Sequence, residues 1–296
     1  MDQQRVLLNK TLIIGIILLF IFICINSSYA FNTVKKSSTS SFNGNILYVG
    51  GSGPDNYTRI QDAIDNATDG DTVFVYNGWY NESIFINKSI SVYGQDIDKT
   101  YIGLGNNLYT FVRIDNANKV EFKRFTIEQH KVSLDQGFYI SNCSNCQIAE
   151  NCIRNREEGM RILRSKSINV SNNTIQNCTF GIMMSHTKVT IEGNIIDGTG
   201  KGYGIWVTIT ENINLIRRNT IKNNLYGIFL DNALFTIIKE NNFLRNTGTP
   251  AVTYFSFLSV WVHNYWNRPR ILPKIIFGIP PGIDVRPALL PFDIGG

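Results

Sequence analysis

The chain has 296 residues, of which 43 % are hydrophobic and 17 % are charged, and its formal net charge is +5. This balance excludes an intrinsically disordered chain, and the length suits one large domain or two small ones. Asparagine is abundant and strong helix formers do not dominate, which argues against an all-α fold. The mild positive charge permits an anionic partner without requiring one.

The chain begins with a segment typical of export. Arg5 and Lys10 precede an apolar run over residues 11–25, and a small-x-small pattern then ends at Ala30. The run is shorter than the ~20 residues that a membrane-spanning helix needs. We therefore expect residues 1–30 to be a signal peptide cleaved near Ala30, with an uncleaved N-terminal anchor as the alternative. Either interpretation predicts an exported protein, extracellular or at the cell surface.

Two short segments follow before any repeat begins. Residues 31–45 are rich in Ser and Thr and are expected to form a linker. Residues 46–70 are expected to form an N-terminal cap that includes a short amphipathic helix. Thr58 and Gln61 have the spacing of a capping box there, and the apolar residues from Ile60 to Ala67 share one helix face.

An internal repeat then governs the sequence. The motif Asn-x-apolar-x-Asn appears as NCIRN, NTIQN, NTIKN and NFLRN, with NIIDG as a variant, and the first asparagines are 22, 21, 25 and 23 residues apart. Glycines spaced by 22, 23 and 23 residues, each followed by an apolar-x-apolar triplet, keep the same register: Gly159, Gly181, Gly204 and Gly227. A repeat of this length holds three short strands and two or three turns, which leaves no room for a helix.

The repeat predicts an all-β fold, a right-handed single-stranded parallel β-helix over residues 46–260. One repeat cannot bury its apolar face alone, so successive repeats must stack. Stacking places the asparagines in two structural columns, in which side-chain amides bond from one turn to the next. The corner glycines are expected to supply a positive φ. The first column is Asn151, Asn173, Asn194, Asn219 and Asn242, and the second is Asn155, Asn177, Asn223 and Asn246.

Residues 261–296 differ from the repeats. Six prolines between residues 269 and 291 exclude regular coils, yet the segment is rich in Ile and Leu. We expect a C-terminal covering tail that lies against the solenoid, with Trp261 and Trp266 plugging the last coil. A partner-docking segment is the alternative.

Residues 57–94, YTRIQDAIDNATDGDTVFVYNGWYNESIFINKSISVYG, resemble the first coils of the pectin-lyase-like right-handed β-helix superfamily. More narrowly, they resemble its NosD-like group of carbohydrate-binding and sugar-hydrolase β-helices. The segments NYWNRPRILPKIIFG and RPALLPFDI resemble a tail found in exported archaeal members. The resemblance covers residues 46–294 and implies the hand of the β-helix. It implies no single activity, because the group is functionally mixed.

One outward column is the candidate ligand or partner surface. It takes the middle residue after each corner glycine: Tyr139, Arg161, Met183, Trp206 and Phe229. Aromatic faces stack on sugar rings, and Arg161 suits an acidic sugar. The competing interpretation is that the apolar tail covers this strip. A second outward column, predicted to be a solvated face, is Arg154, Gln176, Asp197, Lys222 and Arg245.

The sequence shows no catalytic constellation. Carboxylates such as Glu128, Glu158 and Asp231 do not converge in the stacked register into an acid–base pair. No catalytic motif of pectin-lyase-like enzymes transfers residue by residue, so enzymatic activity stays open.

The cysteines raise the question of a metal, because the NosD name is tied to copper supply. Cys143 and Cys146 form a CxxC pair and are the weak candidates for metal binding, but Cys146 is predicted to face inward. Buried unpaired thiols, a disulfide and a metal site are the three alternatives. We expect no cofactor and no resident metal.

The favoured function is non-catalytic binding of extracellular polysaccharide or a cell-surface protein. A pectin-lyase-like lyase or hydrolase is the alternative, and a copper-related maturation factor is the third hypothesis. Nucleic-acid motifs are absent from the sequence. Membrane contact is expected only through the N-terminal segment, and the oligomeric state is not determined by the sequence.

Overall fold

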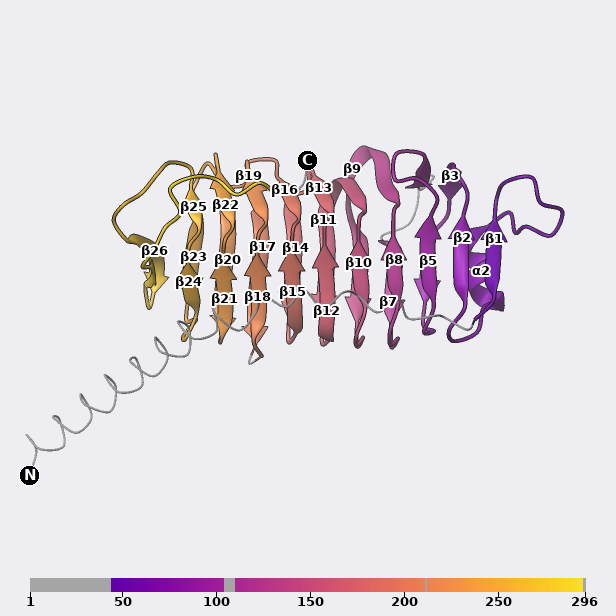
Figure 1. Ribbon diagram of the computed structural model, residues 1–296, viewed down its shortest axis with the longest axis horizontal. Helices are drawn as coiled ribbons and strands as arrows, with labels where there is room; N and C mark the ends of the chain where they lie inside the picture. Colours follow the sequence, from indigo (N-terminus) through magenta and orange to yellow (C-terminus); the bar gives the residue numbers. More distant parts are fainter. Residues whose placement is uncertain (1–43, 104–109, 211, 295–296) are drawn as a thin grey trace, which may run out of the picture. The chain divides into compact units, whose positions relative to one another are not determined.

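The computed structural model describes residues 44–103, 110–210 and 212–294 (Figure 1). Short strands stack turn upon turn into a parallel β-solenoid, so the prediction of an all-β parallel β-helix is confirmed. The expected signal peptide and most of the expected linker lie outside the described residues. Within the described ranges, no helix is long and apolar enough to span a membrane.

The solenoid has three faces, and each strand pairs with the strand one turn away on the same face. Face I holds β1 (Ile46–Val49), β2 (Thr72–Val75), β5 (Ser91–Gly94), β8 (Glu121–Lys123), β10 (Gln147–Ala149), β12 (Lys166–Ser171), β15 (Lys188–Glu192), β18 (Asn214–Arg217), β21 (Thr236–Lys239), β24 (Val260–Val262) and β27 (Gly282–Asp284). Face II holds β3 (Gly78–Asn81), β6 (Thr100–Gly103), β13 (Thr174–Gln176), β16 (Ile195–Asp197), β19 (Thr220–Lys222), β22 (Asn242–Leu244) and β25 (Tyr265–Trp266). Face III holds β4 (Ile84–Ile86), β7 (Thr110–Asp115), β14 (Phe180–Ser185), β17 (Tyr203–Thr210), β20 (Tyr226–Ala233), β23 (Ala251–Tyr254) and β26 (Lys274–Ile279). Two long strands, β9 (Thr126–Ser141) and β11 (Cys152–Leu163), run from face II into face III.

The core is built from inward residues that stack in register. On face II the inward residue of each strand from β11 to β25 is at most 3 % exposed. Burial of each such side chain contributes roughly 1.5–3 kcal/mol. The column ends where the Phe243 and Trp266 rings stack 4.4 Å apart. Its members are Ile153, Ile175, Ile196, Ile221, Phe243 and Trp266.

A continuous asparagine ladder runs along the corner between faces I and II. Asn173 is typical of it: its Oδ1 accepts from the backbone N–H and the Nδ2 of Asn151, each at 3.0 Å. Its own Nδ2 donates to Asn194 Oδ1 at 3.1 Å and to the Ile148 carbonyl at 2.8 Å. These bonds satisfy buried corner groups that would otherwise lack partners. The ladder consists of Asn151, Asn173, Asn194, Asn219, Asn241 and Asn264.

The assignment of Asn242 to this column was wrong by one residue. Strand pairing sets Asn242 opposite Thr220, so Asn241 takes the place equivalent to Asn219. The same shift affects Asn246, whose Oδ1 accepts from the backbone N–H of Asn224 at 3.0 Å and not from Asn223. Likewise Leu244, and not Arg245, lies opposite Lys222 in the second outward column.

The corner between faces II and III uses asparagine for its backbone conformation. Asn155, Asn177 and Asn223 have φ values of 60°, 52° and 55°, in the left-handed region that asparagine tolerates. Asn177 Nδ2 also donates to Asn155 Oδ1 at 3.3 Å, whereas Asn223 Nδ2 donates to Asp197 at 2.7 Å. The second column therefore forms a corner row, but not one continuous chain of amides.

The repeated glycines have a different role from the predicted one. Gly159 and Gly204 are not among the residues with positive φ. A Cβ at Gly159 would lie 2.6 Å from the carbonyl oxygen of Gly181 and 2.6 Å from the Ile175 side chain. Gly204 has the same conflict with Gly227 and Ile221. These positions therefore require glycine because the backbones of successive turns and the core isoleucines approach closely.

Helix α2 (Ile60–Asn66) lies at the end of the solenoid formed by β1 and β2 (Figure 1). The expected capping box does not form. Instead, the Glu82 carboxylate accepts from the backbone N–H groups of Ile60 and Gln61 at 2.8 and 3.0 Å. At the C-terminal end of the helix, Lys88 Nζ donates to the carbonyls of Ile64, Asp65 and Ala67. Opposite charges at the two ends complement the helix dipole.

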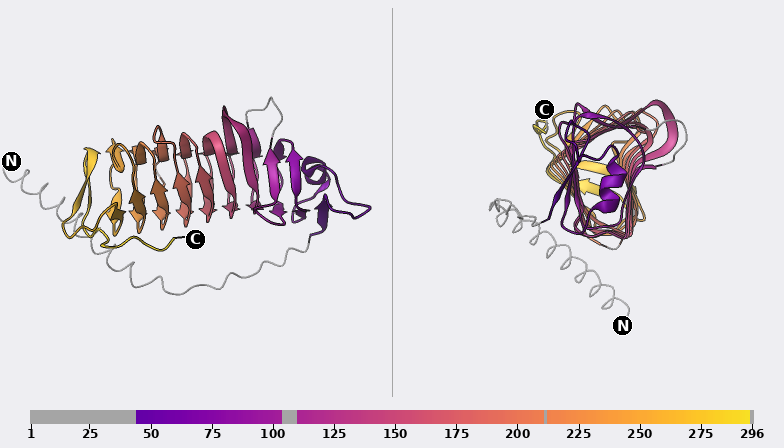
Figure 2. Two further views of the ribbon diagram at one scale, coloured as in Figure 1. Left: turned by 90° about the horizontal axis from the view of Figure 1, so that it is seen from above. Right: turned by 90° about the vertical axis from the view of Figure 1, so that its right-hand side faces the viewer.

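The other end of the solenoid is closed by the antiparallel pair β26–β27, which lies across the lumen in the end-on view (Figure 2). Trp261 and Trp266 are 2 % and 3 % exposed beneath it. The carboxylate of Asp284 terminates the asparagine ladder, because it accepts from Asn264 Nδ2, the Asn264 N–H and Trp266 Nε1, each at 3.0 Å. The tail then continues along the same corner, where Asn242 bonds the Phe292 backbone twice at 2.8 Å.

The ladder makes a stability prediction. Asn173→Ala would leave the backbone N–H of Asn151 without its acceptor and would remove the bonds that the Asn173 amide donates to Asn194 and Ile148 in a buried corner. We expect the unfolding free energy to fall by about 2–4 kcal/mol, measured by urea denaturation. Asn177→Gly is the matched control. It loses one long, exposed hydrogen bond but keeps the left-handed corner, so we expect less than about 1 kcal/mol. Equal losses for the two variants would contradict a structural role for the ladder.

Candidate binding surface

The predicted outward column lies on face III and is longer than the sequence indicated. Strand pairing sets Tyr139, Arg161, Met183, Trp206 and Phe229 opposite one another in successive turns. The same register continues in both directions. At ~4.8 Å per turn the whole column extends about 38 Å. This outer column is Phe85, Arg113, Tyr139, Arg161, Met183, Trp206, Phe229, Val252 and Phe277.

Its first half alternates aromatic rings with arginines. The guanidinium of Arg113 lies 5.9 Å from the Phe85 ring centre and 5.4 Å from that of Tyr139, within the range of cation–π attraction. Arg113 also pairs with Asp115 at 2.9 Å. The stacked side chains therefore hold each other in fixed positions on the outside of the sheet.

Arg161 continues this arrangement with a carboxylate of its own. Its Nε donates to Glu158 Oε2 at 2.6 Å, and its Nη2 contacts the other carboxylate oxygen. This two-point pairing raises the pKa of Arg161, so the guanidinium stays charged. Because both arginines of the column are paired with carboxylates, the column carries little uncompensated charge.

The second half of the column is an aromatic cluster, because a second row of rings lies beside it. Tyr203 stacks on Phe180 and on Tyr226, with centroids 5.6 and 5.2 Å apart and ring planes within 17°. Tyr203 also lies 5.2 Å from both Trp206 and Phe229. The rings are half-buried, largely against one another, and form a firm apolar platform. We call Phe180, Tyr203 and Tyr226 the aromatic flank.

The sequence-based prediction did not include the aromatic flank, although the sequence contains a pattern that marks it. Each of its residues immediately precedes a repeated glycine. The glycine backbone passes close to the turn above, so the preceding side chain is directed outward, beside the outer column. In earlier turns the same position holds Gln136 and Glu158, so the flank changes from polar to aromatic along the solenoid.

The tail does not take the position that the competing interpretation required. Beyond Asp284, its described hydrogen bonds to the preceding turns go to Asn264 and Asn242, at the corner between faces I and II. Strand β26 adds Phe277 to the end of the outer column and does not fold back over it. The described part of the tail therefore does not cover the column.

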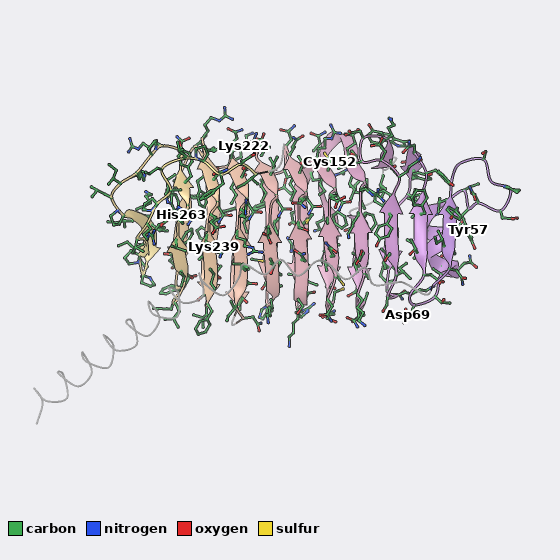
Figure 3. The ribbon with its side chains drawn as sticks, viewed as in Figure 1. Tyr57, Asp69, Cys152, Lys222, Lys239 and His263 are labelled. Atoms are coloured by element: carbon green, nitrogen blue, oxygen red, sulfur yellow. The ribbon has the colours of Figure 1, made fainter. Side chains whose placement is uncertain are left out.

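The second outward column, on face II, contains two ion pairs. Arg154 lies 3.0 Å from Glu128, and Lys222 lies 3.3 Å from Asp197. Lys222 and Cys152 mark this face in Figure 3. Exposed pairs of this kind contribute ~0.2–1 kcal/mol each and leave no strongly charged groove.

The CxxC thiols lie inside the solenoid. Cys143 and Cys146 are 3 % and 1 % exposed, and neither forms a disulfide. The Cys143 thiol donates to the Ser141 carbonyl at 3.1 Å and the Cys146 thiol to the Ser144 carbonyl at 3.3 Å. The hydrogen bond with Cys143, together with burial, raises the pKa of the Cys146 thiol. The Cys146 thiol therefore stays protonated, which makes it a poor nucleophile and a poor metal ligand.

The soft donors that the structure describes do not come together as a copper site. Met183 points outward toward Arg161, whereas Met184 is 1 % exposed in the core. His186 Nδ1 is within 2.9 Å of the Ser185 hydroxyl at a solvent-facing corner. Among the side chains that the structure describes, no three His, Cys, Asp or Glu residues come together as metal ligands.

Comparison with known proteins identifies a family and a fold. Residues 64–279 match the family described as periplasmic copper-binding protein (NosD). No curated protein matches the chain.

Among solved structures, DFA-IIIase from Arthrobacter chlorophenolicus A6 is 11 % identical with a TM-score of 0.56, covering 74 % of this chain and 67 % of its own. The surface protein and adhesin PfbA of Streptococcus pneumoniae is 15 % identical with a TM-score of 0.54, covering 70 % and 72 %. At such identities these similarities show the shared β-helix fold alone.

Thiol burial can be checked directly. In a Cys24→Ser background, Cys143, Cys146 and Cys178 should not react with a bulky aromatic disulfide reagent until the protein is unfolded. Thiol counts before and after denaturant measure this. Because Cys152 is only half-buried, rapid labelling of more than one thiol in the native protein would show that the other thiols are accessible. A mass lower by two hydrogens under non-reducing conditions would show a disulfide.

Proposed function

The chain belongs to the NosD family, and from this premise we propose that it is an exported, non-catalytic protein that binds a polysaccharide or a surface partner along face III. The observation that carries the proposal is the outer column with its aromatic flank. A regular row of rings spaced by about 4.8 Å suits an extended, repeating ligand better than a small molecule.

The chemistry of the column favours stacking over charge attraction. Trp206 and Phe229 offer ring surface that suits the apolar faces of sugars. Arg113 and Arg161 are already paired with Asp115 and Glu158, so each contributes hydrogen-bond donors more than free positive charge. We therefore expect binding to depend only weakly on salt concentration, because the screened Coulomb contribution is small.

Two of the comparisons support this proposal. PfbA, which shares the fold, is a surface adhesin, and the family is described as periplasmic. Both are compatible with a protein that acts outside the cytoplasm. The shared fold does not identify the ligand.

A copper-related role is the second candidate, and the description of the family is the observation that favours it. The described side chains do not fit a resident copper centre, so copper would have to be carried transiently as cargo. Copper that stays bound at one equivalent per chain after dialysis, and is lost in Cys143→Ser/Cys146→Ser, would favour this candidate.

The binding proposal is tested by Trp206→Ala and Phe229→Ala in affinity electrophoresis against a panel of neutral and acidic polysaccharides. We expect each change to weaken binding about tenfold, which corresponds to about 1.4 kcal/mol for one lost stacking platform. Phe257→Ala is the matched control, because this ring is 51 % exposed outside the column. Its affinity should stay within about twofold of the unchanged protein.

Three results would count against the proposal. They are equal losses in Phe257→Ala, binding that disappears at moderate salt, and no binding to any polysaccharide by a correctly folded protein. Release of reducing or unsaturated sugar during incubation would instead identify an enzyme.

A further inference from the structure

The last turn of the solenoid ends in an exposed apolar tip. Ile271 and Leu272 lie in the loop between β25 and β26, and they are 90 % and 77 % exposed. Exposure of two adjacent large aliphatic side chains to water is energetically unfavourable, and such exposed apolar surface is typical of an interaction site. Pro269 and Pro273 flank the pair and restrict the backbone on both sides of the tip.

The apolar surface continues from the tip onto the closing strands. Strand β26 alternates, so that Ile276 faces the core while Ile275 and Phe277 face outward at 66 % and 76 % exposure. Ile283 of β27 pairs with Ile275 and is half exposed. The tip and the outer side of β26 and β27 therefore form one apolar patch, at the end of the solenoid opposite α2 (Figure 2).

Basic residues surround this patch. Arg268, Arg270 and Lys274 lie within three residues of the tip, and burial together with the nearby Arg270 and Arg268 charges lowers the pKa of Lys274. The nearest acidic residue in the sequence, Asp284, is buried and bonded to the asparagine ladder. The charge around the tip is therefore positive and uncompensated by its sequence neighbours.

We propose that this end of the solenoid docks on an anionic lipid surface, with Ile271 and Leu272 entering the interfacial region. Apolar side chains ringed by Lys and Arg are the combination that binds such surfaces. The inference does not depend on the proposed polysaccharide binding, because Ile271 and Leu272 precede β26 and lie outside the outer column, although Phe277 belongs to both surfaces.

A second copy of the chain is the less suitable occupant. A symmetric contact through this patch would bring Arg268, Arg270 and Lys274 of two copies together. Strand addition is also blocked at the closing pair, because β26 already pairs with β23 and β27, and β27 with β24 and β26.

The test places a reporter at the tip of the full-length chain. Leu272→Trp and Leu290→Trp add one tryptophan at positions that are 77 % and 73 % exposed, so the second variant is a matched control in the tail. Each is mixed with vesicles of phosphatidylcholine, or of phosphatidylcholine and phosphatidylglycerol, that contain brominated acyl chains. The hydrophobic N-terminal segment is the same in both variants, so the difference in quenching reports the tip.

We expect the added fluorescence of Leu272→Trp to be quenched on anionic vesicles, with little quenching in Leu290→Trp. Adding Arg268→Gln, Arg270→Gln and Lys274→Gln should weaken the effect at least tenfold, since each basic residue near such a surface contributes about fivefold. Circular dichroism checks that every variant is folded.

Several outcomes would overturn the proposal. One is equal quenching of the two tryptophan variants. Another is quenching that is indifferent to lipid charge or to the three Gln changes. A third is a spectral shift of Leu272→Trp that depends on protein concentration without vesicles, which would assign the patch to self-association.

Discussion

The hydrogen bonds that buried asparagine amides make from turn to turn fix how this solenoid stacks. Each amide both donates and accepts hydrogen bonds. One side chain therefore provides partners for polar groups at the corners of the preceding and the following turns, as Asn173 does for Asn151 and Asn194. This arrangement can repeat without limit but must be terminated. A carboxylate, which only accepts, terminates it at Asp284. The ladder thereby links the turn that holds Asn151 to the closing strands.

The candidate site is a consequence of that register. Because every turn repeats the same pairing, a residue type at one position in the repeat becomes a row on the surface. The rings of the outer column and of the aromatic flank need no loop or cleft to hold them, since the sheet beneath sets their spacing. A row of this kind is stiff, extended and shallow, which suits adsorption of a polymer more than enclosure of a small reactant. The ion pairs within the row keep its charge low, so specificity would come from shape and hydrogen bonding.

Much of the fold could be predicted from the spacing of the repeated asparagines and glycines. The errors of that prediction have identifiable physical causes. The positions of Asn151, Asn173, Asn194 and Asn219 followed from the period alone. The adjacent Asn241 and Asn242 offer two alignments that spacing cannot separate, and only backbone pairing places the first of them in the ladder. The role of Glu82 at the start of α2 joins residues 22 apart in sequence, which no local capping pattern contains.

For the candidate site too, the part that depends on local sequence could be predicted, and the part that depends on pairing between distant strands could not. The outward column from Tyr139 to Phe229 could be read from the triplets after each glycine. Its extension to Phe85 and Phe277 could not, because the flanking turns lack the repeated motif. The position of the tail was also beyond the sequence, since it depends on which corner offers Asn242 and Asn264 as partners.

The central claim is that the outer column holds an extended chain. The most direct measurement is calorimetry with size-defined oligosaccharides of whichever polysaccharide binds. The central five residues span four inter-strand steps, or about 19 Å. The account predicts that affinity rises with oligosaccharide length until the ligand spans that distance and then levels off, with Trp206→Ala lowering the plateau. Affinity that is independent of length, or a plateau unchanged in Trp206→Ala, would contradict it.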